Sequence, residues 1–363
     1  MVDRPTHPSP WKYQSSDGMG LLEFLGWCED LKMNPVLAVY AGYSLMQEHV
    51  NPGPDLEPYV QDALDELEYV TGSANTKWGA VRAQNGHPEP FKLTYVEIGN
   101  EDQFDKSGSY DERYAQFYKA IKAKYPDLQL IATAPIKIMK PDVQDDHYYV
   151  RATQNFHDAN HYDSIDRNGP KIFVGEWATR EGLPTPDMGA ALGDAAWMTG
   201  LERNSDLIVM AAYAPLLVNV NPGGMQWETD LIGYDALRSY GSPSYYMQAM
   251  FASYLGDHTL GSKLEGGSPK LFYSITGNAA KKRLYLKLVN AMSTPQPVDI
   301  DLQGAKVAAT AKLVSLSAHD TQATNTIDHP NQIVPVDSTL QVSSHFKHTL
   351  PGFSIQIIEF QQQ

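Results

Sequence analysis

Short apolar runs alternate with amphipathic helical patterns along the first 257 residues, and this alternation restricts the fold more than any other feature. In the helical pattern of residues 57–72, Val60, Leu64 and Leu67 recur at the spacing of one helix face. The apolar runs have the length of strands and lack polar alternation, so both faces of their sheet must be covered. Strands that alternate with helices form parallel sheets through right-handed crossovers. The sequence therefore predicts an α/β fold.

The number of predicted strands is six, two fewer than the eight of a closed (β/α)₈ barrel. They span residues 34–42, 92–100, 128–135, 145–150, 170–178 and 206–215. The helices between and after them span residues 21–31, 57–72, 111–126, 187–204 and 244–256. Strand number alone also allows a doubly wound open sheet, although no glycine-rich phosphate loop follows any strand.

The pattern changes at about residue 258, where β-rich segments separated by Gly, Pro, Asn and Ser begin. Examples are "RLYLKLVN" and "FSIQIIEF". Such segments are typical of an antiparallel β-sandwich. We therefore expect two domains, an α/β domain over residues 1–257 and a β-sandwich over residues 258–363.

Composition limits the partners of the chain. The formal net charge of −15 argues against nucleic acid and anionic membranes, which need clustered Lys and Arg, whereas a neutral carbohydrate is indifferent to it. Cys28 is the single cysteine, so there is no internal disulfide. The first residues lack the apolar stretch of a secretion signal, and there is no apolar run of 18 residues. We expect a soluble protein, and its compartment stays open because a signal could have been removed.

Polar residues collect at the carboxyl ends of the predicted strands, where parallel α/β sheets place their functional groups. These residues are Asn100, Glu101, His147, Tyr149, Glu176, Trp177, Tyr213 and Asn219. Two carboxylates at the ends of different strands suit glycoside hydrolysis, in which one protonates the leaving oxygen and the other attacks or activates water. Solvated carboxylates at strand ends are nevertheless common. Glu97 lies four residues before Glu101, so alternation along the strand directs both side chains to the same face. We expect Glu97 to have a structural ion-pair or hydrogen-bond partner.

Other chemistries have weaker signals. His157 and His161 have the i,i+4 spacing of two metal ligands on a helix, but the segment around His161 is typical of a turn and no HExxH motif is present. No G-x-S-x-G nucleophile motif occurs. We therefore expect no metal and no cofactor.

Four motifs carry a family resemblance. "EIGNED" (97–102), "DDHYY" (145–149), "VGEWA" (174–178) and "YAPLLVN" (213–219) resemble family 51 of the glycoside hydrolases. The best-known activity of that family is non-reducing-end α-L-arabinofuranosidase. The resemblance runs from about residue 3 to residue 256, and the remainder fits the family's C-terminal sandwich.

The resemblance implies a role for each candidate residue. Glu101 matches the general acid/base and Glu176 the nucleophile of a retaining mechanism. Asn100 would hold the 2-hydroxyl of the sugar. His147 and Tyr149 would line the pocket, with Tyr149 or its neighbour hydrogen-bonded to Glu176. The remaining candidates for substrate contact are Trp177, Tyr213, Asn219, which is a looser match, and Trp227, which resembles a sugar-stacking wall.

The resemblance also implies a departure from the family. Its strand numbering makes the six predicted strands numbers three to eight, and its first two strands and N-terminal domain have no counterpart in this sequence. We therefore expect an incomplete, (β/α)₆-like barrel with open edges at strands three and eight. Open edges favour pairing with another chain. We expect loops, residues 1–16 or a second subunit to cover them, and our hypothesis is a homo-oligomer.

Three functions follow in order of preference. The first is a retaining glycosidase of the α-L-arabinofuranosidase type that acts on arabinose-containing hemicellulose. The second is a glycosidase for β-1,4-linked xylo- or gluco-oligosaccharides, because a gap in the barrel would open the pocket into a cleft. The third is a carbohydrate-binding remnant without catalysis.

Overall fold

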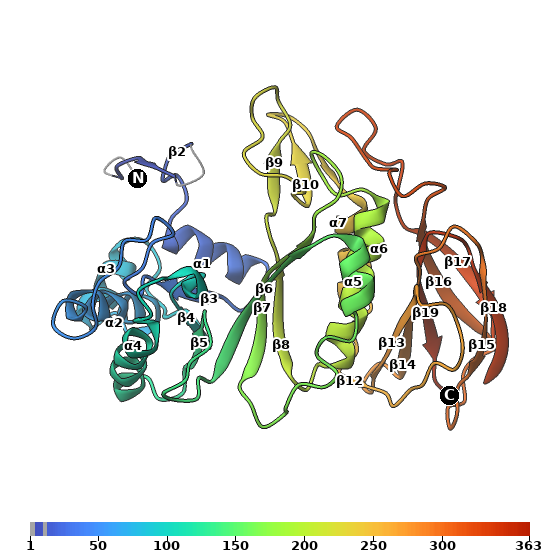
Figure 1. The fold of residues 1–363 in the computed structure, drawn as a ribbon, viewed down its shortest axis with the longest axis horizontal. Coiled ribbons are helices and arrows are strands. Elements are labelled where there is room, and N and C mark those ends of the chain that lie inside the picture. The colour runs from blue at the N-terminus through green and yellow to red at the C-terminus, as the bar shows by residue number, and fades with distance from the viewer. Residues whose placement is uncertain (1–3, 10–12) are drawn as a thin grey trace. The chain divides into compact units, whose positions relative to one another are not determined.

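A computed structural model describes residues 4–9 and 13–363 and shows an α/β fold with a C-terminal β region (Figure 1). Six strands form a parallel half-barrel sheet in the order β3-β4-β5-β6-β7-β8. Their bounds are β3 Val36–Val39, β4 Tyr95–Ile98, β5 Gln129–Ala132, β6 Val143–Val150, β7 Lys171–Thr179 and β8 Ile208–Tyr213. Each strand neighbours the next one along the chain, as in a barrel, and the order never reverses as it does in a doubly wound sheet. The predicted six-stranded incomplete barrel is confirmed, and its assignment to strands three to eight stays a prediction.

The predicted helices are also present. They are α1 Leu21–Asp30, α2 Glu57–Thr71, α4 Tyr110–Lys124, α6 Met188–Arg203 and α7 Pro243–Ser253. Among the described residues, no helix is long and apolar enough to cross a membrane. The chain divides into two compact units, and the division falls within β6 and β7. Unit 1 comprises Met1–Asp146 and Arg167–Phe173, and unit 2 comprises His147–Asp166 and Val174–Gln363.

The core of unit 1 lies between helices and strands β3 to β5. Helices α2 and α4 lie side by side and turn their apolar faces to the sheet (Figure 1). Leu67 of α2, Phe117 of α4 and Val96 of β4 are completely buried in this core. Burying each such side chain contributes about 1.5–3 kcal/mol. This packing holds the end of β4, where Glu101 follows.

A short helix, α3 (Lys77–Gln84), was not predicted from the sequence. It carries no clear apolar stripe, and its buried side chain is Arg82. The guanidinium of Arg82 donates to five backbone carbonyl groups, those of Tyr69, Val70, Gly72, His87 and Pro88. The helix is therefore placed by polar contacts to the backbone of the segments just before and after it, which a hydrophobic pattern cannot reveal.

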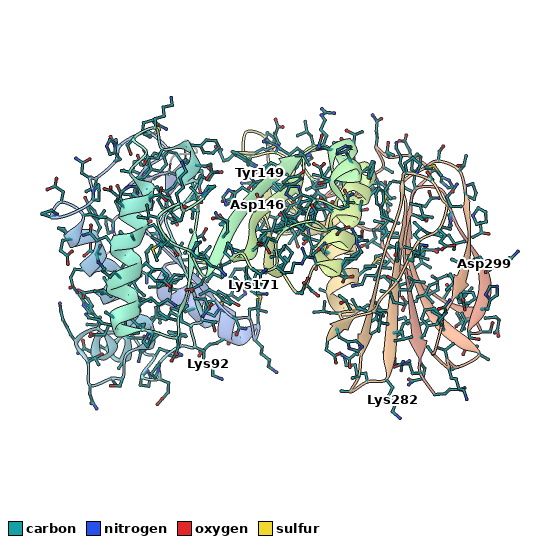
Figure 2. The ribbon with its side chains drawn as sticks, turned by 60° about the horizontal axis from the view of Figure 1, so that its bottom comes forward. Lys92, Asp146, Tyr149, Lys171, Lys282 and Asp299 are labelled. Carbon is teal, nitrogen blue, oxygen red and sulfur yellow. The ribbon has the colours of Figure 1, made fainter. Side chains whose placement is uncertain are left out.

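In unit 2, helices α6 and α7 pack against the larger antiparallel sheet of the C-terminal region (Figure 1). The larger sheet has the order β12-β13-β14-β19-β16-β17, and β15 pairs with β18. Their bounds are β12 His258–Thr259, β13 Leu271–Asn278, β14 Arg283–Asn290, β15 Gln296–Asp301, β16 Thr310–Ser317, β17 Val336–Gln341, β18 His345–Leu350 and β19 Ser354–Gln361. Figure 2 shows Asp299 on β15 and Lys282 at the turn before β14. The predicted antiparallel β region is confirmed, and the domain boundary at residues 257 and 258 stays a prediction.

Several small elements were not predicted. Helix α5 (Ala152–Asp158) follows β6, and two-stranded pairing joins β1 (His7–Pro8) and β2 (Gln14–Ser15). A three-stranded sheet follows β8, with β9 Leu217–Asn219, β10 Ile232–Tyr234 and β11 Ser239–Gly241. Strands of two or three residues are too short to show an alternating pattern.

Candidate active site

The backbone at the end of β4 turns sharply to present Glu101. Gly99 has a φ of +102° and Glu101 a φ of +52°, both in the left-handed region. A Cβ atom on Gly99 would lie 2.0 Å from Asp102 Oδ2, so only glycine fits there. For a residue other than glycine such a φ costs about 1–3 kcal/mol and persists only where the surroundings hold it. Glu101 then opens the 3₁₀ helix of residues Asp102–Phe104.

The group that holds this turn is the buried carboxylate of Asp102. It accepts hydrogen bonds from the Asn100 backbone N–H at 3.1 Å and from Thr133 Oγ1 at 2.7 Å. Its other oxygen lies 2.9 Å from Arg113 Nη2, and both side chains are completely buried. Arg113 also pairs with Asp105 at 2.6 Å and donates to the carbonyl of Ala41. The turn around Glu101 is thus tied to β5, α4 and the segment after β3.

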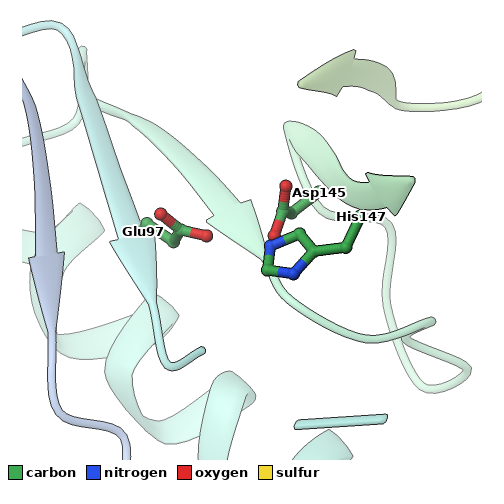
Figure 3. Close-up of side chains that lie close together, drawn as sticks. All are labelled: Glu97, Asp145 and His147. Carbon is green, nitrogen blue, oxygen red and sulfur yellow. The ribbon is translucent and has the colours of Figure 1, made fainter. Parts of the chain in front are cut away.

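A second acidic position lies earlier on β4. The carboxylate of Glu97 points toward Asp145 of β6, and their oxygens lie within 4.8 Å of one another (Figure 3). Both residues have interaction partners. Along β6, Asp145, His147 and Tyr149 alternate with their neighbours and so share one strand face. The structural role predicted for Glu97 stays a prediction.

The second candidate carboxylate, Glu176, lies on β7 among polar groups of β6. The hydroxyl of Tyr149, near the carboxyl end of β6 (Figure 2), donates to Glu176 Oε2 at 2.6 Å. His147 Nδ1 lies 3.5 Å from the same oxygen. The side chain of Glu176 is 34% exposed and that of His147 only 9%. The structure therefore brings three of the predicted site residues together, with an accessible carboxylate at their centre.

Trp177 and Tyr213 pack against each other in unit 2. Trp177 is 2% exposed, and its ring meets that of Tyr213 edge to face at 5.4 Å. The Tyr213 hydroxyl donates to the carbonyl of Thr229 at 3.0 Å. Burial raises the pKa of Tyr213 well above its ordinary value. Alternation along β7 directs Trp177 away from the face that carries Glu176, so this pair supports that strand from its other side.

Two more of the predicted residues are Asn219, which ends β9, and Trp227, which lies in the loop between β9 and β10. Asn219 Oδ1 accepts hydrogen bonds from the backbone and side chain of Asn221, at 3.0 and 2.9 Å, and so shapes a turn. Trp227 lies under the guanidinium of Arg180, whose carbon is 5.3 Å from its ring centre. In the same loop, burial raises the pKa of Asp230 to about 7. Asn219 therefore shapes the start of this loop, and Trp227 packs against Arg180, which directly follows β7. The substrate contacts predicted for both residues stay predictions.

A buried polar network anchors the carboxyl end of β7. The carboxylate of Asp194, on α6, accepts from the Thr179 backbone N–H at 2.9 Å and from Ser244 Oγ at 2.6 Å. Asn155 of α5 donates to Thr179 Oγ1 at 2.7 Å. All four side chains are at most 1% exposed. Burial raises the pKa of Asp194 to about 7. The network joins β7 to three helices close to Glu176.

Four residues near the site were not predicted from the sequence: Asp102, Arg113, Arg180 and Asp194. Asp194 carried a signal, because it is a charge within the otherwise apolar helix "MGAALGDAAWMTG" and a charge there needs a partner. Asp102 directly follows Glu101 and was treated only as part of a motif. Arg113 and Arg180 carried no signal, since arginines on helices and at strand ends are usually solvated.

The two histidines with metal-ligand spacing have other partners. His157 Nδ1 lies 2.6 Å from Asp158 Oδ1, and the ring of His161 packs on Tyr162 and Trp197. In the described ranges, neither unit taken by itself brings three potential metal ligands together. The predicted absence of a metal or cofactor stays a prediction.

The fold, a half-barrel sheet followed by antiparallel β sheets, matches that of solved glycoside hydrolases. The family model of the α-L-arabinofuranosidase 1 domain matches residues 1–167, and that of the α-L-arabinofuranosidase C-terminal domain matches residues 175–354. The chain belongs to the α-L-arabinofuranosidase family, family 51 of the glycoside hydrolases.

Relatives of the chain occur in fungi and plants. α-L-Arabinofuranosidase A of Aspergillus kawachii (strain NBRC 4308) is 38% identical over 368 residues, which cover 98% of this chain and 57% of that protein. α-L-Arabinofuranosidase 2 of Arabidopsis thaliana is 36% identical over 352 residues, which cover 94% of this chain and 51% of that protein. The chain therefore spans about half the length of the curated relatives it matches.

Two solved structures illustrate the structural likeness. An arabinose-bound MgGH51 α-L-arabinofuranosidase is 37% identical and superposes with a TM-score of 0.94, over 100% of this chain and 60% of that chain. An arabinose complex of the α-L-arabinofuranosidase from Thermotoga maritima superposes with a TM-score of 0.79 at 19% identity, over 100% of this chain and 83% of that one. The second likeness concerns the fold alone.

Proposed function

We propose that the chain carries the catalytic residues of a retaining α-L-arabinofuranosidase that removes non-reducing-end arabinofuranosyl groups from arabinose-containing hemicellulose. The observation that carries the proposal is the accessible carboxylate of Glu176, which the Tyr149 hydroxyl contacts at 2.6 Å. Membership of the family and the names of the relatives support it. The two alternatives, a β-1,4-glycosidase and a binding remnant, gain no such support.

In the first step, Glu176 attacks the anomeric carbon of the arabinofuranosyl group, and the bond to the leaving oxygen breaks. Because Tyr149 donates to Oε2, we assign the attack to Oε1. The Tyr149 hydrogen bond and His147 hold the carboxylate in one orientation, which reduces the cost of reaching the attack geometry. Glu101 donates its proton to the leaving oxygen in the same step.

In the second step, Glu101 takes a proton from water, and the water oxygen attacks the anomeric carbon and displaces Glu176. Two inversions at one carbon give retention of configuration, and retention requires carboxyl groups about 5–5.5 Å apart. The Asp102 network would keep Glu101 in place through both proton transfers. Asn100, whose side chain is exposed beside Glu101, is assigned to the 2-hydroxyl of the sugar.

The test is hydrolysis of aryl α-L-arabinofuranoside, aryl β-xyloside and aryl β-glucoside by the wild type and by Glu176→Ala. We expect the wild type to hydrolyse the arabinofuranoside, the variant to lose about 10⁴-fold or more in kcat, and azide to restore part of the rate. NMR of the first product should show retained configuration. The matched control is Glu265→Gln, a glutamate exposed in the β region that pairs with Lys263.

Three outcomes would contradict the proposal. Hydrolysis confined to the β-xyloside or β-glucoside would favour the alternative substrate. No turnover of any substrate would favour the binding remnant. Turnover that survives Glu176→Ala would remove Glu176 from the mechanism.

A further inference from the structure

A cation that the proposed reaction does not use lies beside Glu176. Arg180 directly follows β7, and its backbone N–H donates to the Val150 carbonyl at 2.8 Å, which continues the pairing of β7 with β6. Glu176 and Arg180 are four residues apart along extended chain, so their side chains leave the same face. The guanidinium carbon lies 6.0 Å from the ring centre of Tyr149, whose hydroxyl contacts Glu176. Arg180 is thus one side chain removed from the proposed nucleophile.

The guanidinium is held by aromatic rings and not by a carboxylate. Its carbon lies over both Tyr149, at 6.0 Å, and Trp227, at 5.3 Å. Within the described part of the chain, no carboxylate lies within ion-pair distance of Arg180, although the residue is exposed. The neighbouring Glu181 accepts from the Ala152 backbone N–H at 3.1 Å. Arg180 is therefore a positioned cation whose charge is not neutralised by the protein.

Such a group is suited to binding an anion. A guanidinium that rests on ring faces keeps its N–H donors available at the edge and offers a carboxylate two parallel hydrogen bonds. The rings also limit its motion, so little side-chain entropy is lost when a ligand binds. The arabinofuranosyl group itself is neutral, so the anion must belong to the part of the substrate that leaves.

We propose that Arg180, held by Tyr149 and Trp227, forms an anion-binding subsite for the leaving group and recognises a uronic acid in the oligosaccharide from which arabinose is removed. This inference rests on the proposed arabinofuranosidase function. It assigns to Trp227 the role of supporting Arg180. The proposed subsite also specifies the substrate class: arabinose-substituted chains that carry uronic acid are preferred over neutral chains.

The test compares two arabinose-substituted oligosaccharides of identical length and linkage, one with a free uronic acid and the other with its methyl ester. Because the two differ only in whether this group is an ionised carboxylate or a neutral methyl ester, the ratio of their kcat/KM values measures recognition of the carboxylate. We expect the wild type to favour the free acid about three- to tenfold at low salt. The ratio should decline as ionic strength rises, since the site is exposed.

Substitutions at Arg180 identify the source of the preference. Arg180→Met should bring the ratio of kcat/KM values close to one, and Arg180→Lys should keep part of the preference because the charge remains but the paired donors do not. The matched control is Arg283→Met, which removes the same charge from β14 and should leave the ratio at the wild-type value. Circular dichroism and thermal unfolding establish that each variant is folded.

The outcomes separate the subsite from the proposed function. Hydrolysis of both oligosaccharides by the wild type with a ratio of one, or a preference that Arg180→Met leaves unchanged, overturns the subsite while the arabinofuranosidase function stands. A wild type that hydrolyses neither these oligosaccharides nor an aryl α-L-arabinofuranoside overturns the proposed function, and the subsite with it.

Discussion

Arg113 Nη2 lies 2.9 Å from Asp102 Oδ1, with both side chains completely buried, directly behind the turn that presents Glu101. A buried ion pair stabilises a fold only when its remaining hydrogen bonds are made. Here Asp102 also accepts from Thr133 and from the Asn100 backbone, and Arg113 also pairs with Asp105. The pair therefore specifies one backbone path at the end of β4, the left-handed turn at Glu101.

The first prediction concerns this pair. Arg113→Met leaves the Asp102 charge buried without its cation and should lower the free energy of unfolding by about 3–5 kcal/mol. Urea unfolding measures the change. The matched control is Lys263→Met, which breaks the exposed pair with Glu265 and should cost less than about 1 kcal/mol. A loss below about 1 kcal/mol in Arg113→Met would show that the pair does not hold the turn.

The second prediction compares neighbouring tyrosines of β6. Tyr149→Phe removes the hydrogen bond to Glu176 and should lower kcat about 10- to 100-fold, because hydrogen bonds to charged groups contribute about 1.5–3 kcal/mol. Tyr148, on the opposite face, donates to Asp158 and stacks on Trp197 at 4.2 Å. Tyr148→Phe should therefore lower stability and leave kcat near the wild-type value. Equal kinetics in the two variants would contradict the assigned role of Tyr149.

The third prediction concerns Asp194. Its pKa is about 7 in the folded chain and 3.8 ordinarily, so the folded state keeps a proton that the unfolded state loses between these values. The contribution of Asp194 to the free energy of unfolding is fully present below pH 4 and is lost as the pH rises through 7. The total loss in the free energy of unfolding is roughly 4 kcal/mol. Asp194→Asn keeps the acceptor for Thr179 and removes the titration.

The measurement is the free energy of unfolding from pH 4 to pH 8 for the wild type and Asp194→Asn. The difference between the two curves isolates Asp194 from Asp230, whose pKa is also raised to about 7. The exposed Asp299, changed to Asn, is the control and should follow the wild-type curve. Parallel curves for the wild type and Asp194→Asn would contradict the prediction.

The fourth prediction is self-association through the ends of the parallel sheet. β3 and β8 stand at the two ends of the strand order and have one neighbour each in this sheet. Edge strands with unpaired backbone groups favour pairing with another chain. Sedimentation equilibrium over a hundredfold range of concentration should show a dimer or larger species. A mass that stays at the 40.3 kDa of one chain throughout would remove this expectation.

Sequence patterns predicted the six strands, the five longer helices and the antiparallel C-terminal region, because burial of one face leaves a periodic pattern and burial of both faces of a strand leaves a continuous apolar run. They did not predict α3, which polar contacts to Arg82 hold in place, or the three-stranded sheet after β8, whose strands are too short for any period. The same division holds in the site. Glu101 and Glu176 stand in motifs that a sequence displays, and the family resemblance also implied the hydrogen bond from Tyr149 to Glu176. The Asp102–Arg113 pair behind the turn at Glu101 is set by packing.

The sequence by itself determined which residues lie at strand ends and which chemistry they can perform, because alternation and strand length follow from local order along the chain. The tertiary structure decided what those residues meet. Arg113 reaches Asp102 from a helix, Asp194 reaches Thr179 from another, and Trp227 comes from a loop 47 positions beyond Arg180. Such contacts form when segments distant in sequence are buried against one another. No local sequence pattern predicts the distances between these side chains or the protonation state that burial gives them.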